Sequence, residues 1–456
     1  MTAEDTIVAI ATAPGEAALA ITRLSGPDAL SIAARFFRGA RSPLTTGTHR
    51  ILFGSFVSEG GVPLDTVLLS VFRAPHSYTG GDLVEISSHG GPAVPRAILE
   101  TLVRGGARPA RPGEFTERAF RNGKLDLAQA EAVASLVRAR SERSLRAAHA
   151  TLGGDLSRRV AGLDAELVGL LAEVESRLDF PGDVREAADA EELAARCASA
   201  AEVAREWLAR LPSARRREEG VRVAIVGAPN VGKSSLLNAL VGYDRAIVSA
   251  EPGTTRDTVE ASIWLDGVEL LLADTAGLRE TSDPVERLGV ERSERAAAAA
   301  DLTLLVRDAS CPDTDAVGRA GPRAGPGGGA SIVVWNKSDL ANGNPRPAAA
   351  VATVAIRPGG VEALICALRD VLPGIVGESV GGRSEIPATS LRQEALLGEA
   401  AAALERAASE LRKADAAHDL AAVDLTEARR AFGEMVGRGV DDAVVAAIFS
   451  RFCIGK

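Results

Sequence analysis

A glycine-rich segment in the second half of the chain has the residue types and spacing of a phosphate-binding loop. Residues 227 to 234 read Gly-Ala-Pro-Asn-Val-Gly-Lys-Ser, which fits the pattern G-x-x-x-x-G-K-[ST]. Glycines let backbone N–H groups wrap a phosphate, Lys233 can reach the β- and γ-phosphates, and the Ser234 hydroxyl can coordinate Mg²⁺. An apolar run over 221–226 precedes the loop and a helical pattern over 235–241 follows it, as the motif requires. The predicted contacts come from Asn230, Val231, Gly232, Lys233, Ser234 and Ser235.

Three further motifs follow in the order expected of a GTP-binding domain. The segment Gly253-Thr254-Thr255-Arg256 offers a threonine to complete the Mg²⁺ shell. The segment Asp274-Thr275-Ala276-Gly277 offers an aspartate near the metal and a backbone N–H for the γ-phosphate. In Asn336-Lys337-Ser338-Asp339, the carboxylate can accept hydrogen bonds from N1–H and the 2-amino group of guanine. Adenine offers no such pair of donors, so this motif selects GTP. A last guanine-contacting segment is predicted at Ala355-Ile356-Arg357, which lacks the serine that small GTPases usually carry there.

The groups that would hydrolyse GTP are less obvious. Ras-like proteins position the attacking water with a glutamine after the D-x-x-G motif, but this chain has Leu278 at that position. The Asn230 amide could instead hold a monovalent cation beside the phosphates. The positive charge of that cation would then lie where an arginine finger would otherwise place one. Glu286, in the acidic stretch over 279–287, could position water. A single acid in such a stretch is more often only a solvated surface residue.

The sequence patterns that position these motifs predict a multidomain fold. At about 150 residues per domain, a chain of 456 residues suggests about three domains. Mixed strand and helix patterns over 1–119 predict an α+β domain. Helical periodicity over 120–216 and again over 381–456 predicts one helical domain in two pieces, because the last piece alone is too short to build its own core. Alternating strand and helix patterns over 217–380 predict an inserted α/β domain with a parallel sheet.

Local signals within these domains give more detailed expectations. Glu59-Gly60-Gly61 predicts a hairpin, and Asp126 with Gln129 predicts a helix-capping box. A helix is expected over 190–211, a Gly/Pro-rich loop over 321–329 and a linker over 374–382. One helix face is predicted to carry Leu163, Leu167, Leu170, Leu171, Val174 and Leu178.

Composition excludes several classes of protein. The hydrophobic fraction of 46% and the charged fraction of 25% are ordinary for a folded protein and exclude a disordered or fibrous chain. The formal net charge of −9 argues against coating of nucleic acid through bulk charge. The four cysteines form no C-x-x-C pair, so neither a zinc site nor a disulfide framework is expected. No apolar run has the length of a membrane span, and acids near the start of the chain argue against a signal peptide, so we expect a cytoplasmic protein without a membrane partner.

Taken together, these motifs resemble the MnmE (TrmE) family of bacterial tRNA-modification GTPases over nearly the whole chain. The resemblance rests on DTIVAIAT near the start, RPGEFTERAF, KLDLAQAEA, GAPNVGKSSLLNAL, PGTTRD, DTAGLRE and the final FCIGK. It implies an α+β folate-binding N-terminal domain, a discontinuous α-helical domain and an inserted Ras-like P-loop G domain. It also implies a homodimer formed through the N-terminal domains, in which GTP and potassium bring the two G domains together and so activate hydrolysis.

The resemblance assigns roles to individual residues of the nucleotide site. It implies that Asn230 binds K⁺ together with backbone oxygens of Ser249, Glu251 and Thr254, and that Ser234 and Thr255 bind Mg²⁺. The resemblance also implies that Ala250 and Pro252 belong to the nucleotide-binding segment. Glu286 becomes the expected water-positioning residue. Arg256 and Arg279 become candidate switch contacts in G-domain pairing, although either could be an ordinary surface residue.

The resemblance also implies a folate site made of Arg23, Glu85, Lys124 and Lys456. The positive charges of Arg23 and Lys124 suit the folate carboxylates, and Glu85 can accept hydrogen bonds from the pterin N–H groups. Taken alone, each of these residues would more often be an ordinary surface charge. The expected ligand is a tetrahydrofolate derivative, either 5-formyl- or methylene-tetrahydrofolate. Cys453 is implied to lie near this site, and whether it reacts or only packs stays open.

The implied activity is modification of tRNA. With the FAD-containing partner MnmG in a heterotetramer, such a protein adds an aminomethyl or carboxymethylaminomethyl group at carbon 5 of the wobble uridine, while GTP hydrolysis drives a conformational cycle. Two alternatives are a ribosome-assembly GTPase, which would usually carry an added RNA-binding module, and a non-enzymatic GTP-gated interaction protein with a decayed folate site.

Overall fold

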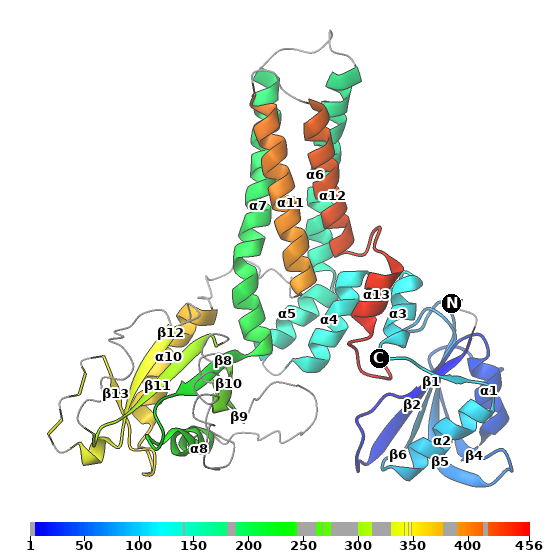
Figure 1. Ribbon diagram of the computed structural model, residues 1–456. Coiled ribbons are helices and arrows are strands. Elements are labelled where there is room, and N and C mark those ends of the chain that lie inside the picture. The colour runs from blue at the N-terminus through cyan, green and yellow to red at the C-terminus, as the bar shows by residue number, and fades with distance from the viewer. Residues whose placement is uncertain are drawn as a thin grey trace, which may run out of the picture. The chain divides into compact units, whose positions relative to one another are not determined.

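The computed structural model describes residues 5–139, 142–179, 188–243, 261–266, 268–274, 300–311, 330–341, 343–344, 346–347, 349–376, 390–413 and 418–456 (Figure 1). These residues form two compact units. The first unit combines Met1–Val137, Ala150–Ala204 and Ala395–Lys456, and the second combines Arg138–His149 with Arg205–Glu394. The multidomain fold class predicted from the sequence is confirmed, since the first unit is discontinuous in the chain and the second carries a separate α/β sheet.

The N-terminal part of the first unit is a seven-stranded sheet with the order β3-β4-β5-β6-β2-β1-β7. Neighbouring strands are antiparallel except for the parallel pair β1–β7. The predicted hairpin joins β4 to β5, where Ser58 N–H donates to the Val62 carbonyl at 2.8 Å. The elements are β1 (Ile7–Ile10), β2 (Leu19–Ser25), α1 (Ala29–Phe36), β3 (Phe37–Gly39), β4 (Arg50–Val57), β5 (Pro63–Phe72), β6 (Leu83–His89), α2 (Ala93–Arg104), β7 (Arg108–Pro109) and α3 (Glu114–Arg121).

Helices α1 and α2 cover one face of this sheet. Period-2 alternation puts every second side chain of a strand on that face, where the fully buried Leu24, Phe56, Leu69 and Ile86 form the sheet side of the core. Helix α2 contributes Ile98 and Leu102, which are also fully buried. The opposite face carries Arg23 on β2 and Glu85 on β6, which lie directly across from each other in the strand register.

The rest of the first unit is helical. Its elements are α4 (Leu127–Arg138), α6 (Asp155–Asp179), the first part of α7 (Ala188–Glu219), most of α11 (Leu391–Leu411), α12 (His418–Met435) and α13 (Asp442–Phe449), while α5 spans Glu142–Leu152. The predicted capping box is present at α4, because Asp126 N–H donates to Gln129 Oε1 and Gln129 N–H donates to Asp126 Oδ1, both at 2.9 Å. The C-terminal helices pack on the earlier ones, as Arg429 of α12 shows by pairing with Asp164 of α6 at 3.0 Å.

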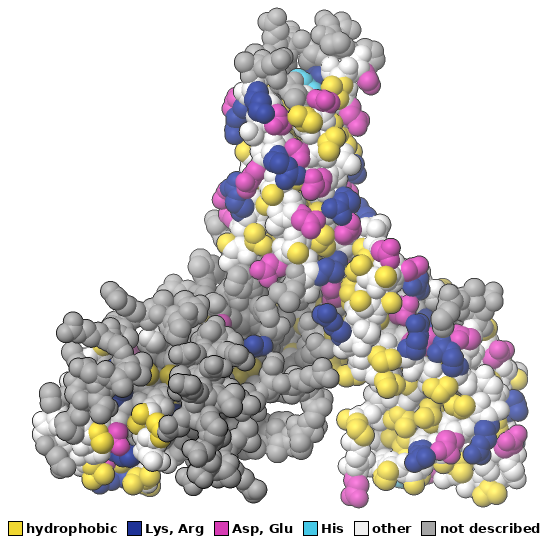
Figure 2. Space-filling view, viewed as in Figure 1, with side chains coloured by type: hydrophobic (Ala, Val, Ile, Leu, Met, Phe, Trp, Pro, Cys, Tyr) yellow, Lys and Arg dark blue, Asp and Glu magenta, His cyan; other side chains and the backbone are white. Residues whose placement is uncertain are grey.

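The apolar face predicted for α6 is mostly correct. Leu163, Leu167, Leu170 and Val174 are buried, and Leu171 is half-buried. Leu178 lies in the last turn of the helix and is 44% exposed, so the buried part of this face ends before it. On the visible face of the bundle, basic and acidic side chains are interspersed rather than gathered by sign (Figure 2).

The second unit holds a six-stranded sheet with the order β13-β12-β11-β8-β10-β9. The parallel sheet expected from the sequence is confirmed for β13, β12, β11, β8 and β10, whereas β9 at the edge pairs antiparallel with β10. A short connection between β9 and β10 permits only antiparallel pairing, whereas the parallel strands are joined by longer crossovers. The elements are β8 (Val221–Val226), α8 (Lys233–Tyr243), β9 (Ala261–Leu265), β10 (Val268–Asp274), β11 (Leu302–Asp308), β12 (Ala330–Asn336), η1 (Ser338–Leu340), β13 (Val351–Ala352) and α10 (Glu362–Val376).

Two predicted boundaries differ from the structure. Helix α7 continues through Pro212 to Glu219, beyond the predicted end at 211. Helix α10 contains Pro373 and Gly374 and ends at Val376, so the predicted linker over 374–382 begins too early. The predicted loop over 321–329 lies outside the described residues. Among the described helices, none combines the length and the apolar composition that a membrane crossing requires.

Candidate nucleotide and folate sites

The phosphate-binding loop lies between the buried strand β8 and helix α8. Gly232 has φ +95°, and a Cβ added there would lie 2.4 Å from Asn336 Nδ2, so a side chain has no room. Lys233 is 8% exposed, and its Nζ donates to the carbonyl oxygens of Gly227 and Ala228 at 3.0 and 2.8 Å. The loop therefore has the close backbone approach that a phosphate cradle needs.

Asn230 occupies a left-handed backbone position in this loop, with φ +61°. Asparagine and glycine adopt this conformation more readily than other residues do. The Asn230 residue is exposed, while its carbonyl oxygen accepts a hydrogen bond from Lys337 Nζ at 2.8 Å. Lys337 Nζ also pairs with Asp308 at 2.6 Å. Although burial opposes ionisation of Asp308, the hydrogen bond from Lys337 helps to hold the pKa of its carboxyl below the ordinary value.

Asn336 joins the phosphate loop to the guanine-contacting loop. It is 2% exposed, and its Nδ2 donates to the Val231 carbonyl at 2.9 Å. Its Oδ1 accepts from Thr353 Oγ1 at 3.1 Å and from Ala355 N–H at 3.2 Å. The sequence had marked Asn336 and Ala355, but not Thr353, whose hydroxyl completes this contact. Both loops are therefore held in register by one buried amide.

The predicted guanine-binding carboxylate already has a charged neighbour. Asp339 lies in η1, and its Oδ2 is 3.1 Å from Arg357 Nη2. Ile356 is 82% exposed, and Ala355 turns its N–H toward Asn336. Ser338 Oγ donates to the Thr353 carbonyl at 3.1 Å.

Several predicted site residues lie outside the residues that the structure describes. For the switch segments these are Ser249, Ala250, Glu251, Pro252, Gly253, Thr254, Thr255, Arg256, Thr275, Ala276, Gly277, Arg279 and Glu286. The backbone of Asp274 ends β10 beside Ile225 of β8. Ser234 and Ser235 lie at the start of α8 and are exposed.

On the N-terminal domain, the structure brings two predicted folate residues into direct contact. Arg23 Nε and Nη2 lie 2.9 and 2.7 Å from Glu85 Oε1. The remaining nitrogen, Nη1, donates to the Gly455 carbonyl at 3.2 Å, so the last residues of the chain reach this pair. Gly455 has φ +95°, and a Cβ there would lie 2.6 Å from the Ile10 carbonyl, so only glycine fits against β1.

Two aromatic rings flank the Arg23 guanidinium and were not predicted. The guanidinium carbon lies 5.4 Å from the centre of the Tyr78 ring and 5.6 Å from the centre of the Phe115 ring, within the range of cation–π attraction. Tyr78 also hydrogen-bonds to Thr116 through its hydroxyl at 2.8 Å, and burial raises the pKa of that hydroxyl. Phe115 lies in the RPGEFTERAF motif, and that motif is the one sequence signal that could have pointed to its place beside Arg23.

The other two predicted folate residues lie at the ends of nearby segments. Lys124 is exposed, and its Nζ donates to the Pro75 carbonyl at 3.2 Å. The Lys456 backbone oxygen accepts from Phe115 N–H at 3.2 Å. Cys453 is exposed rather than buried, and its carbonyl oxygen accepts from Gly113 N–H at 3.4 Å.

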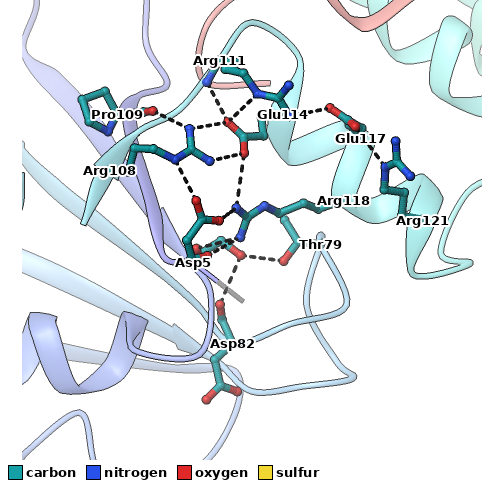
Figure 3. Close-up of polar contacts among 11 residues, drawn as sticks. Asp5, Thr79, Asp82, Arg108, Pro109, Arg111, Glu114, Glu117, Arg118 and Arg121 are labelled. Carbon is teal, nitrogen blue, oxygen red and sulfur yellow. Dashed lines mark hydrogen bonds and ion pairs between the residues drawn. The ribbon is translucent and has the colours of Figure 1, made fainter. Parts of the chain in front are cut away.

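An ion-pair cluster holds α3 beside β1 and β7 (Figure 3). Glu114 is nearly buried and pairs with Arg108 at 2.6 Å and with Arg118 at 3.3 Å. The same two arginines reach Asp5, at 2.7 and 2.6 Å respectively. Although burial opposes its ionisation, hydrogen bonds from Arg108 hold the pKa of Glu114 below the ordinary value. This cluster fixes the start of α3, and so places Phe115 beside Arg23.

Comparisons with known proteins agree with this arrangement. The family model described as "GTP-binding protein TrmE N-terminus" matches residues 6–124, and the model described as "MnmE helical domain" matches residues 127–453. A protein of Thermus thermophilus named tRNA modification GTPase MnmE is 44% identical over 457 residues, which is 100% of both chains. Proteins of the same name from Moorella thermoacetica and Chloroflexus aurantiacus are 43% and 44% identical, over 99% of this chain and 100% of theirs. The chain therefore belongs to the MnmE family of tRNA modification GTPases.

Proposed function

We propose that this chain is a K⁺-activated GTP hydrolase that modifies carbon 5 of the wobble uridine in certain tRNAs. Asn336 is the observation that carries the nucleotide part of this proposal. Because its amide bonds both the phosphate loop at Val231 and the guanine loop at Ala355, the two halves of a guanine nucleotide site are built as one unit. In this proposal Ser234 and Thr255 hold Mg²⁺, while Asp339 recognises guanine.

The K⁺ site in this proposal centres on Asn230. Its left-handed backbone and exposed position put an amide oxygen at the rim of the phosphate loop. Backbone oxygens of Ser249, Glu251 and Thr254 complete the proposed shell. A cation there would stabilise the charge that develops on the phosphates during hydrolysis.

Steady-state GTP turnover in potassium and in sodium tests this site. We expect turnover in K⁺ to exceed that in Na⁺ by at least about ten-fold, given the effect of one removed electrostatic group. Asn230→Gly is the appropriate variant, because glycine keeps the φ +61° backbone while removing the amide. It should bind GDP normally and turn over GTP equally slowly in both salts. Equal rates for the unaltered chain would remove K⁺ from the proposal.

Glu286 is proposed to position the attacking water, with Arg256 and Arg279 as contacts between paired G domains. Glu286→Ala should abolish hydrolysis and leave GDP affinity unchanged. Glu280→Ala, which removes a neighbouring acid of the same stretch, should leave both properties unchanged. Loss of GDP binding by Glu286→Ala would mean that this residue supports the fold instead.

The N-terminal domain is proposed to bind a tetrahydrofolate derivative. The residues present fit this group: the side chains of Arg23 and Glu85 are 16% and 23% exposed, and the rings of Tyr78 and Phe115 lie beside them. With Oε1 held by Arg23, the Glu85 carboxylate is oriented to accept pterin N–H groups. Lys124 and Lys456 are proposed to bind the folate carboxylates. When bound, methylene-tetrahydrofolate would supply the one-carbon unit.

Titration of the purified chain with 5-formyl-tetrahydrofolate tests the folate site without requiring activity. We expect Glu85→Gln to weaken binding by at least about ten-fold, because a hydrogen bond to a charged group is worth about 1.5–3 kcal/mol. Glu100→Gln, on the exposed side of α2, is the matched control and should bind normally. GDP affinity should be unchanged in both variants. Undiminished folate binding by Glu85→Gln would refute this assignment.

Homodimer formation is proposed to use the face of the N-terminal sheet that α1 and α2 leave open. Ile51 and Phe53 alternate on β4, and Leu68 lies opposite Phe53 on β5, so all three project from one face. They are 67%, 71% and 46% exposed, which is unusual for neighbouring large apolar side chains. Phe53→Asp should convert the dimer to a monomer in light scattering after size-exclusion chromatography. A dimer that survives this change would place the interface elsewhere.

The chain is proposed to divide into an N-terminal domain over 1–119, a helical domain over 120–216 and 381–456, and a G domain over 217–380. The partner is proposed to be an FAD-containing protein of the MnmG kind, joined in a heterotetramer in the cytoplasm. The net charge of −9 supports this division of labour, because the partner could provide much of the surface that binds tRNA.

A further inference from the structure

The guanine-recognition carboxylate of the proposed function is paired with a side chain of the chain itself. Arg357 Nη2 lies 3.1 Å from Asp339 Oδ2. The Asp339 side chain is 17% exposed, whereas that of Arg357 is 65% exposed. Within the described part of the chain, this arginine is the charged partner that the structure gives to Asp339.

The two partners of this carboxylate would present the same chemistry. A guanidinium and the N1–H/2-amino edge of guanine are both planar groups in which neighbouring nitrogens on one carbon carry parallel N–H donors. Carboxylates bind such paired donors with both oxygens. Arg357 therefore offers Asp339 the hydrogen-bonding pattern of the base itself.

The backbone around Arg357 is fixed independently of this ion pair. Arg357 N–H donates to the Val354 carbonyl at 3.0 Å, and the Arg357 carbonyl accepts from Gly360 N–H at 3.0 Å. The buried Asn336 holds the preceding residues through Thr353 and Ala355. Because these bonds do not involve the Arg357 side chain, the guanidinium can leave Asp339 without rearranging the loop.

We propose that Arg357 is an internal substitute for guanine, which competes with the base for Asp339 and must be displaced when GTP or GDP binds. This inference rests on the proposed function, because it requires Asp339 to be the guanine acceptor. By pairing with this carboxylate, Arg357 lowers the apparent affinity for the nucleotide. It is therefore a residue that sets affinity and not a contact of the bound base.

The size of the effect follows from the exposure of the pair. Exposed ion pairs are worth at most about 1 kcal/mol, because water and salt screen them and both side chains lose freedom. Because the nucleotide must break this ion pair in order to bind, the presence of Arg357 should weaken nucleotide binding by about two- to five-fold. The effect should disappear at high salt, where ion pairs on the surface are screened.

Equilibrium binding of fluorescently labelled GDP to the purified full-length chain tests this inference. Arg357→Ala should bind GDP two- to five-fold more tightly than the unaltered chain at low ionic strength, and equally tightly at 1 M KCl. Arg369→Ala is the matched control, because it removes an exposed arginine that pairs with Asp266 in the same unit. It should leave GDP affinity unchanged, which separates the loss of Arg357 from a general change in charge.

A double-mutant cycle with Asp339→Ala provides the second measurement. In that background GDP affinity is low, and replacing Arg357 should change it no further. Unchanged or weaker GDP binding by Arg357→Ala in the unaltered background would overturn the inference while leaving the proposed function intact. Absence of GDP binding by the unaltered chain would instead overturn the proposed function, and the inference with it.

Discussion

Asn336→Ala is the most informative single change in the second unit, because one buried amide joins two loops of the nucleotide site. The substitution removes hydrogen bonds to the Val231 carbonyl, the Thr353 hydroxyl and the Ala355 N–H, at 2.9, 3.1 and 3.2 Å. Each such bond contributes about 1 kcal/mol net. The expected loss is therefore about 3 kcal/mol of the free energy of unfolding of this unit.

Tryptophan fluorescence during urea unfolding measures this loss selectively. Trp264 on β9 and Trp335 on β12 lie in the sheet of the second unit, and Trp207 lies on the part of α7 that belongs to the same unit, so the signal comes mainly from that unit. At a slope of about 2 kcal/mol per M, the midpoint should fall by about 1.5 M. Asn344→Ala is the matched control: this amide donates one described hydrogen bond, to Ala309 at 3.0 Å, and its loss should shift the midpoint by about 0.5 M.

Nucleotide affinity provides the second readout of the same change. With the two loops no longer tied, Asn336→Ala should bind GDP at least about ten-fold more weakly, even at temperatures where it remains folded. Asn344→Ala should bind GDP normally. If the midpoint of Asn336→Ala falls no further than that of the control, or if its GDP affinity is unchanged, the reasoning that this amide holds the two loops together is refuted.

Three further predictions concern Gly232, Glu114 and Cys197. Gly232→Ala should fold but lose GDP binding, measured by isothermal calorimetry, because its Cβ would lie 2.4 Å from the Asn336 amide; retained affinity would contradict this close approach. The pKa of the Glu114 carboxyl is lowered from its ordinary value of 4.5, so the ionised group stabilises the first unit at pH values above 4.5. This stability should be lost as the pH falls through the lower pKa of the folded state. Circular dichroism should therefore show a smaller loss of stability between pH 5 and pH 3 in Glu114→Gln, and an equal loss would exclude this group as a cause. Burial raises the pKa of the Cys197 thiol to about 11, so Ellman's reagent at pH 8 should rapidly label the three exposed cysteines and reach Cys197 only after unfolding; rapid labelling of a fourth thiol in the folded chain would contradict this.

Local sequence signals predicted the elements of this fold well. The phosphate loop lies between its strand and helix, and Asp126 with Gln129 forms the expected capping box, because both patterns depend on neighbours within a few residues. The ends of two helices were predicted too early. Pro212 lies inside α7 and Pro373 inside α10, so in both helices the rest of the helix outweighs the local cost of a proline.

Contacts between distant residues could not be predicted from spacing. Arg23 and Glu85 are 62 residues apart, and only the register of β2 on β6 makes them neighbours. The resemblance to a family placed both in one site, but gave no sign that they pair with each other. In the same way, the missing serine of the guanine loop was visible in the sequence, whereas the pairing of Arg357 with Asp339 depends on the turn between Val354 and Gly360.

Analysis of tRNA nucleosides tests most directly whether this chain acts as a GTPase in tRNA modification. Cells lacking the gene would be complemented with the unaltered chain or with Glu286→Ala, and their tRNA would be digested and quantified by mass spectrometry. We expect the aminomethyl-type groups at carbon 5 of the wobble uridine to disappear on deletion, to return with the unaltered chain and to stay absent with Glu286→Ala. Wobble uridines that stay fully modified without the gene would contradict this activity.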